Sequence, residues 1–89
     1  MIERELVVSN RLGLHARATA KLVQVLSAYR CNATLSSRGR DVNAKSIMGV
    51  MLLAAGKGTP VLLRVDGDDE VEAAEAVASL FERRFDEDD

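Results

Sequence analysis

The stretch CNATLSSRGRDVNA, residues 31–44, alternates apolar and polar side chains and is broken once, at residues 37–39. Alternation with a period of two residues is typical of a half-buried strand, and a short break that contains glycine is typical of a hairpin turn. The pattern therefore predicts a strand over residues 31–36 and a returning strand over residues 40–44. Because strands joined by so short a turn run antiparallel, we expect an antiparallel sheet.

The segments on both sides of this hairpin alternate between strands and helices. Their apolar residues recur every second position, or form a short run, where a strand is expected, and every three to four positions where a helix is expected. The expected elements are a strand over 2–8, a helix over 16–29, a short helix over 47–55, a strand over 61–65 and a last helix reaching Phe85. The order β-α-β-β-α-β-α predicts an α+β fold in which helices cover one face of the sheet. The apolar run at 61–65 favours a central place for that strand.

The ends of the helices carry local signals of their own. Ser46 is a favoured N-cap for the short helix, and Asp69 with Glu72 forms a possible capping box for the last helix. The acidic residues 86–89 are expected to form a frayed, solvated tail.

Length and composition limit the class of protein. A chain of 89 residues has room for one domain with one core, residues 1–89, and with only three aromatic residues that core must be mainly aliphatic. Twelve basic against fourteen acidic residues leave no basic excess, so nucleic acid is not an expected partner. The single Cys31 is expected to be buried and suits a reducing compartment, and neither a signal peptide nor a membrane-spanning run is visible. We expect a cytoplasmic protein without membrane insertion, metal or cofactor.

His15, the only histidine of the chain, lies in the segment GLHAR, residues 13–17, where an extended segment gives way to the first helix. An imidazole titrates near neutral pH and can act as a nucleophile. A helix start presents free backbone N–H groups and favours negative charge. Gly13 allows a sharp turn, and the Arg17 guanidinium matches the geometry of a phosphate. The segment therefore predicts a site at which His15 carries a phosphoryl group steadied by Arg17.

The short helix after Ser46 is apolar on every side, and two interpretations of it stay open. Either part of it forms an exposed apolar patch, of the adaptable kind that methionines favour at partner surfaces, or the whole helix is buried. Ser46 likewise has two interpretations. Its hydroxyl can serve only as a cap, or it can also take a phosphate, which the neighbouring Lys45 would tolerate.

These motifs together resemble a known family. GLHAR at 13–17, AKSIM at 44–48 and GKG at 56–58 are similar to the motifs of HPr, the histidine-containing phosphocarrier of the bacterial phosphoenolpyruvate phosphotransferase system. The resemblance covers nearly the whole chain and implies an open-faced β-sandwich, with a four-stranded antiparallel sheet and three helices on one face. One departure is Ala18, where the family usually has proline. The tail at 85–88 is similar to the nitrogen-related branch, which signals and does not move sugar.

The resemblance also implies a function. His15 would accept a phosphoryl group on Nδ1 from enzyme I and pass it to a IIA-type domain, as a monomeric carrier that is not itself a turnover catalyst. Arg17 would steady the phosphate, and Ser46 would be the regulatory site of an HPr kinase/phosphorylase. Partners would dock on Ala16, Ala20, Ile47, Met48 and Met51, with His15 open between them.

Two alternatives belong to other classes. One is a regulatory module, of the nitrogen-related or catabolite-control type, that acts by protein–protein contact. The other is a small ligand-binding domain in which His15 has no role.

Overall fold

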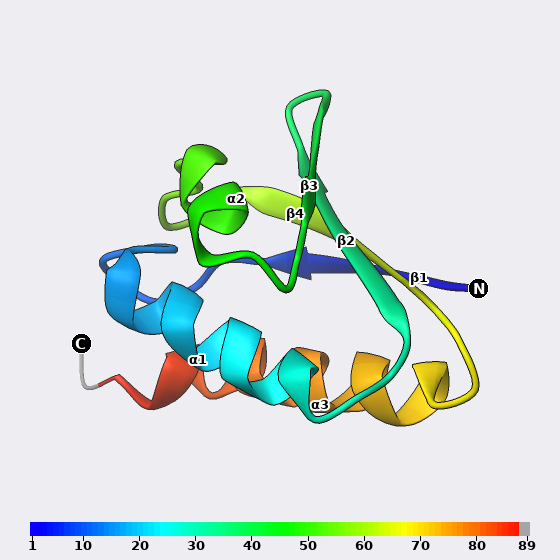
Figure 1. Cartoon of the computed structure of the whole chain (residues 1–89). Coiled ribbons are helices and arrows are strands. Elements are labelled where there is room, and N and C mark those ends of the chain that lie inside the picture. Colours follow the sequence, from blue (N-terminus) through cyan, green and yellow to red (C-terminus); the bar gives the residue numbers. More distant parts are fainter. Residues whose placement is uncertain (88–89) are drawn as a thin grey trace.

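Four strands form one antiparallel sheet in the order β1-β4-β2-β3, which differs from their order along the chain. The computed structural model describes residues 1–87, and Figure 1 shows the arrangement of its elements. The strands are β1 (Ile2–Val7), β2 (Asn32–Ser37), β3 (Arg40–Asn43) and β4 (Pro60–Asp66); the helices are α1 (Ala16–Ser27), α2 (Ile47–Leu52) and α3 (Glu70–Glu82), followed by a turn, η1 (Arg84–Asp86). The order β-α-β-β-α-β-α and the α+β class are confirmed.

The hairpin of β2 and β3 is present as predicted. Leu35 faces Val42 and Ser37 faces Arg40, and the two turn residues between them, Arg38 and Gly39, have φ of 52° and 78°. Positive φ at both central residues is the geometry that matches the twist of a two-residue hairpin. β4 pairs with both β1 and β2, so the central place predicted for it is also confirmed.

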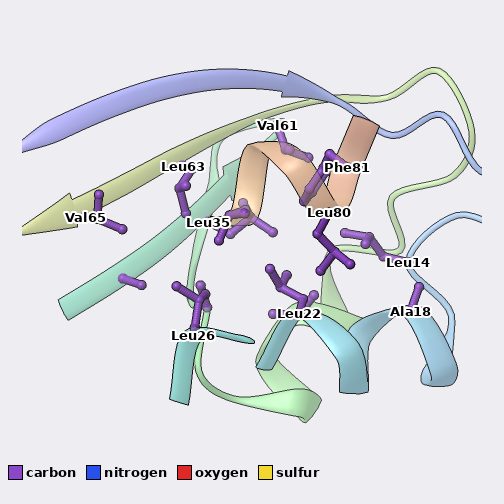
Figure 2. Close-up of a cluster of buried hydrophobic side chains, with 14 of the residues drawn as sticks. Leu14, Ala18, Leu22, Leu26, Leu35, Val61, Leu63, Val65, Leu80 and Phe81 are labelled. Atoms are coloured by element: carbon purple, nitrogen blue, oxygen red, sulfur yellow. The ribbon is translucent and has the colours of Figure 1, made fainter. Parts of the chain in front are cut away.

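The helices bury their apolar sides against one face of the sheet. Figure 2 shows Leu22 and Leu26 of α1 directed toward Leu35 of β2, with Leu80 of α3 beside them. Alternate residues of β4 supply the other side of this core, namely Val61, Leu63 and Val65. The predicted open-faced arrangement of a four-stranded sheet and three helices is therefore confirmed, and the core is mainly aliphatic.

The start of α3 differs from the predicted capping box. The Asp69 carboxylate makes no cap hydrogen bond and instead accepts hydrogen bonds from the backbone N–H groups of Arg30 (2.7 Å) and Cys31 (3.0 Å). These bonds, that from Arg30 first, lower the pKa of Asp69 below its ordinary value. Glu70, not Glu72, reaches back, and its Oε1 accepts from the Gly67 N–H at 3.1 Å. The Asp69 carboxylate thus connects α3 to the segment just before β2, because the N–H groups of Arg30 and Cys31 lie within hydrogen-bond distance of it.

The end of the chain also differs from the prediction. α3 stops at Glu82, and three successive residues, Arg84, Phe85 and Asp86, take the left-handed conformation with φ of 54°, 57° and 59°. This conformation costs about 1–2 kcal/mol for each residue with a side chain, and burial of the Phe85 ring against Phe81 (centroids 4.9 Å apart) offsets the cost. Asp86 pairs with Arg83 at 3.0 Å, and Glu87 also has side-chain partners. Residues 86 and 87, which the sequence predicts as part of a frayed tail, thus have side-chain partners in the structure; residues 88–89 of that predicted tail lie outside the described residues.

No helix within residues 1–87 is long and apolar enough to cross a membrane.

Candidate functional site

His15 is the N-cap of α1, at the point where an extended loop enters the helix. Its backbone is extended (φ −77°, ψ −178°), and its carbonyl accepts the first helical hydrogen bond, from the Thr19 N–H at 2.9 Å. The imidazole makes no capping bond to the helix. His15 thus lies at the helix start, as predicted, where the first backbone N–H groups of α1 have no partner within the helix, and its ring is not used as a cap.

The loop before His15 depends on Gly13. With φ of 69°, Gly13 makes the sharp turn that the sequence predicts, and a Cβ there would come within 2.6 Å of the Ala55 carbonyl oxygen. The close approach allows the Leu14 N–H to donate to the same oxygen at 2.9 Å. This bond anchors the loop to the segment after α2, so glycine is needed both for the conformation and for the space.

Ala18 does not disturb the start of α1. Its side chain is fully buried in the core, and α1 begins at Ala16 without help from a proline. The geometry of the segment from His15 to Arg17 is thus set by packing and by the Thr19 contacts, among them a hydrogen bond from Thr19 Oγ1 to the Leu14 carbonyl at 3.1 Å.

The His15 ring has a partner that the sequence did not predict. Nε2 lies 2.6 Å from Oε2 of Glu87, and the other oxygen of this carboxylate accepts from Asn10 Nδ2 at 2.9 Å. Burial raises the pKa of Glu87, but the hydrogen bonds from Asn10 and His15 and the nearby charges of His15 and Lys21 outweigh it, so the pKa lies below its ordinary value. Glu87 is therefore a carboxylate at neutral pH, and His15 is not open as expected but covered on one side, with 28% of its side chain exposed.

A pocket of about 610 Å³ surrounds the exposed edge of the ring. Its walls come from the loop before α1, the first turns of α1 and the end of the chain, and the lining residues are Arg11, Leu12, His15, Ala16, Arg17, Lys21, Asp86 and Glu87. Three of these are cations, so the pocket can receive an anion in spite of the two carboxylates. Arg17, predicted to steady a phosphate, is the second residue of α1 and is exposed in this pocket.

Ser46 is an N-cap, as predicted. It precedes α2, and its Oγ accepts a hydrogen bond from the Gly49 N–H at 3.1 Å. The Lys45 ammonium is turned away to the end of α1, where it donates to the Tyr29 carbonyl at 2.7 Å. The hydroxyl of Ser46 is half-buried, so it remains partly accessible from solvent.

The structure decides between the two interpretations of α2. Val50 and Leu53 face the core, whereas the rest of the apolar surface is exposed to solvent. We call this surface the α2 patch; it consists of Ile47, Met48, Met51 and Leu52, of which Met48 is 78% exposed. α2 lies against α1, whose Ala16 and Ala20 are also exposed. The exposed-patch interpretation is therefore the one that holds. Leu12, which lines the pocket together with His15, is 61% exposed and was not predicted.

The sequence of this chain is similar to those of known proteins. A family model described as the phosphorylation site of the PTS HPr component matches residues 2–83. This chain belongs to the HPr family. The phosphocarrier protein HPr of Xylella fastidiosa is 64% identical over 88 residues, which cover 99% of both chains. That of Cupriavidus necator is 51% identical over 87 residues, 98% of each chain.

The fold of this chain is likewise that of its solved relatives. The crystal structure of HPr-C-His from Thermoanaerobacter tengcongensis superimposes with a TM-score of 0.95 at 41% identity, over 99% of both chains. The relatives are named as phosphocarrier proteins and match nearly the whole chain, so this chain is a phosphocarrier of the phosphotransferase system.

Proposed function

We propose that this protein accepts a phosphoryl group on Nδ1 of His15 from enzyme I, itself charged by phosphoenolpyruvate, and passes it to a IIA-type acceptor. The observation that carries the proposal is the Glu87 carboxylate on Nε2 of His15. A carboxylate can only accept, so Nε2 bears the hydrogen and Nδ1 keeps its lone pair. The Nδ1 lone pair attacks phosphorus, and the electron pair of the broken bond stays with the donor enzyme.

The surroundings of the ring suit the product of this step. A phosphoryl group on His15 would lie at the N-terminus of α1, where free N–H groups and the helix dipole stabilise negative charge. Arg17 lines the same pocket and can offer two parallel N–H groups to the phosphate oxygens. His15 and Arg17 are thus the residues on which transfer depends.

The same geometry supports a carrier and not an enzyme with turnover of its own. The ring is reached from outside, so one partner can deliver the phosphoryl group and another can remove it. We propose that both dock, in the cytoplasm and onto a monomer, on Ala16 and Ala20 of α1 and on Ile47, Met48 and Met51 of the α2 patch. The exposed methionines adapt their shape, as a surface that meets two different partners requires.

Phosphoryl transfer from purified enzyme I tests this function directly. We expect that phosphoenolpyruvate and enzyme I place one phosphate on the protein, that the bond is labile in acid and stable in base, and that it maps to the peptide containing His15. Addition of a IIA-type domain should then remove the phosphate. Phosphate on another residue, or a phosphorylated protein that gives nothing to any IIA-type domain, would contradict the proposal.

Ser46 is proposed as a regulatory site for an HPr kinase/phosphorylase. A charge at this position adjoins Ile47 and the α2 patch, and a partner docking there would have to desolvate it. We expect Ser46→Asp to slow phosphorylation of His15 by enzyme I about tenfold, which corresponds to about 1.4 kcal/mol of docking free energy. Labelling rates at several enzyme I concentrations measure the effect.

Ser46→Ala is the matched control, because it removes the cap but adds no charge. It should lower the stability of the protein by about 1 kcal/mol while labelling proceeds at the original rate. Aspartate caps a helix as well as serine does, so the Ser46→Asp protein should stay as stable as the original. Equal labelling rates in all three proteins would remove Ser46 from the regulatory proposal.

A further inference from the structure

Three side chains from distant parts of the chain form a continuous hydrogen-bonded series at the site. Asn10, in the loop after β1, donates from Nδ2 to Oε1 of Glu87 at 2.9 Å, and Oε2 of Glu87 lies 2.6 Å from Nε2 of His15. Exposure falls along the series, from 28% for the His15 side chain through 12% for Glu87 to a fully buried Asn10. The series therefore runs from the reactive ring into the interior.

Asn10 is itself held in place. Its Nδ2 also donates to the Gly13 carbonyl at 2.8 Å, and the backbone carbonyl of Asn10 accepts from the Gly13 N–H at 3.2 Å. The Asn10 side chain that orients Glu87 is thus bonded to the turn that positions His15. The Glu87 carboxylate and the His15 ring are therefore both positioned by the turn at Gly13.

The tail that carries Glu87 is anchored independently of the His15 contact. Phe85 is fully buried, and its carbonyl accepts a hydrogen bond from Lys21 Nζ of α1 at 2.6 Å. Two turn hydrogen bonds, Asp86 N–H to the Arg83 carbonyl and Glu87 N–H to the Arg84 carbonyl, close the left-handed segment. Figure 1 shows that this segment passes beside α1. The match to the family model ends at residue 83, before this tail.

We infer that Glu87 is a positioning residue for phosphoryl transfer: held by Asn10, it keeps the hydrogen of His15 on Nε2 throughout the cycle. The inference rests on the proposed function of His15 as phosphoryl acceptor. It adds a positioning residue to the site and a reason why the ring stays in the tautomer whose free lone pair is on Nδ1.

The chemistry balances without any proton leaving the site. When the Nδ1 lone pair forms the bond to phosphorus, the ring still carries hydrogen on Nε2 and so becomes an imidazolium, whose positive charge the Glu87 carboxylate offsets. When the acceptor attacks phosphorus, the electron pair of the N–P bond returns to Nδ1 and the neutral ring leaves. A ring that had lost the Nε2 hydrogen would have to leave as an anion, which is a much poorer leaving group. Glu87 therefore assists both half-reactions without accepting the proton.

The test is Glu87→Gln in the full chain, with Glu82→Gln as a matched control. Glutamine keeps the shape, but its amide can either accept from Nε2–H or donate to bare Nε2, so it no longer selects one tautomer. Glu82 is exposed on α3 and gives the same change of charge near the same end of the chain. Nitrogen-15 NMR of the unphosphorylated ring reads the tautomer, and rapid-quench labelling reads the rates of uptake from enzyme I and of transfer to a IIA-type domain.

We expect the original protein and Glu82→Gln to show the Nε2–H tautomer, and Glu87→Gln to show a mixture of the two. Both transfer rates should fall roughly 10- to 100-fold in Glu87→Gln, the range found when a partner that orients a histidine is removed. An unchanged tautomer, or unchanged rates, would overturn the inference, and a faster uptake would identify the tail as a cover instead. If the original protein itself takes no phosphate on His15, the proposed function is wrong. The NMR result still shows separately whether Glu87 selects the Nε2–H tautomer.

Discussion

Replacement of His15 by alanine is expected to abolish phosphoryl uptake while the fold persists. The imidazole makes no capping bond to α1, and it contacts the Glu87 carboxylate near the surface, so its loss removes little that holds the core together. Removal of the nucleophile, by contrast, removes the step itself, and losses of at least about 10³-fold are usual when a covalent catalyst loses its attacking group. Labelling by enzyme I and phosphoenolpyruvate measures the effect.

The control for this variant is Arg17→Ala, which leaves the nucleophile but takes away one of the three cations that line the pocket. It should still be labelled on His15, although more slowly, because the helix amides remain. Thermal unfolding should show that both variants stay folded. Phosphate that persists on His15→Ala after treatment with enzyme I would reject His15 as the acceptor. A His15→Ala protein that still regulated a partner would favour the regulatory module instead.

Phe85→Ala is expected to be the most destabilising single change near the site. The ring is fully buried and packs on Phe81, and truncation of such a side chain costs about 3–5 kcal/mol. Alanine would also keep the unfavourable left-handed backbone (φ 57°) without the burial that offsets it. A domain of this size is stable by about 5–15 kcal/mol in total, so urea unfolding should show a large shift of the midpoint.

Phe85→Leu separates packing from anchoring. Leucine fills most of the volume, so the loss should be clearly smaller than that of alanine, and Lys21 can still donate to the carbonyl of residue 85. A loss below about 1 kcal/mol for Phe85→Ala would show that the ring is not part of the core in solution. It would also weaken the inference about Glu87, because Phe85 is what brings the tail beside α1.

The elements that could be predicted are those whose signal lies within a few neighbouring residues. Alternation over residues 31–44 identified the hairpin of β2 and β3, and the spacing of Leu22 and Leu26 identified the buried side of α1. Ser46 was recognised as a cap because the group it bonds, the Gly49 N–H, is three residues away. His15 was recognised because a helix start, a glycine and an arginine surround it within five residues.

The features that could not be predicted depend on residues far apart in the chain. The Asp69 carboxylate accepts hydrogen bonds from the backbone amides of Arg30 and Cys31, which are 39 and 38 residues away, and not from the amides of its own helix. Glu87 lies 72 residues from His15 and 77 from Asn10. An acidic tail has the composition of a solvated end, and nothing local marks Phe85 as the residue that turns it back.

Local sequence patterns were thus sufficient for the strands, the helices and the Ser46 N-cap, and they singled out His15 as the candidate for phosphorylation, because periodicity and capping are properties of neighbouring residues. The strand order, the exposed side of α2 and the carboxylate on the His15 ring were settled by tertiary packing. Each of these features depends on which arrangement of the elements buries the most apolar surface, and that depends on all the elements of the core together. In the tail, the free energy gained by burying Phe85 offsets the cost of three left-handed residues, and this places Glu87 against His15.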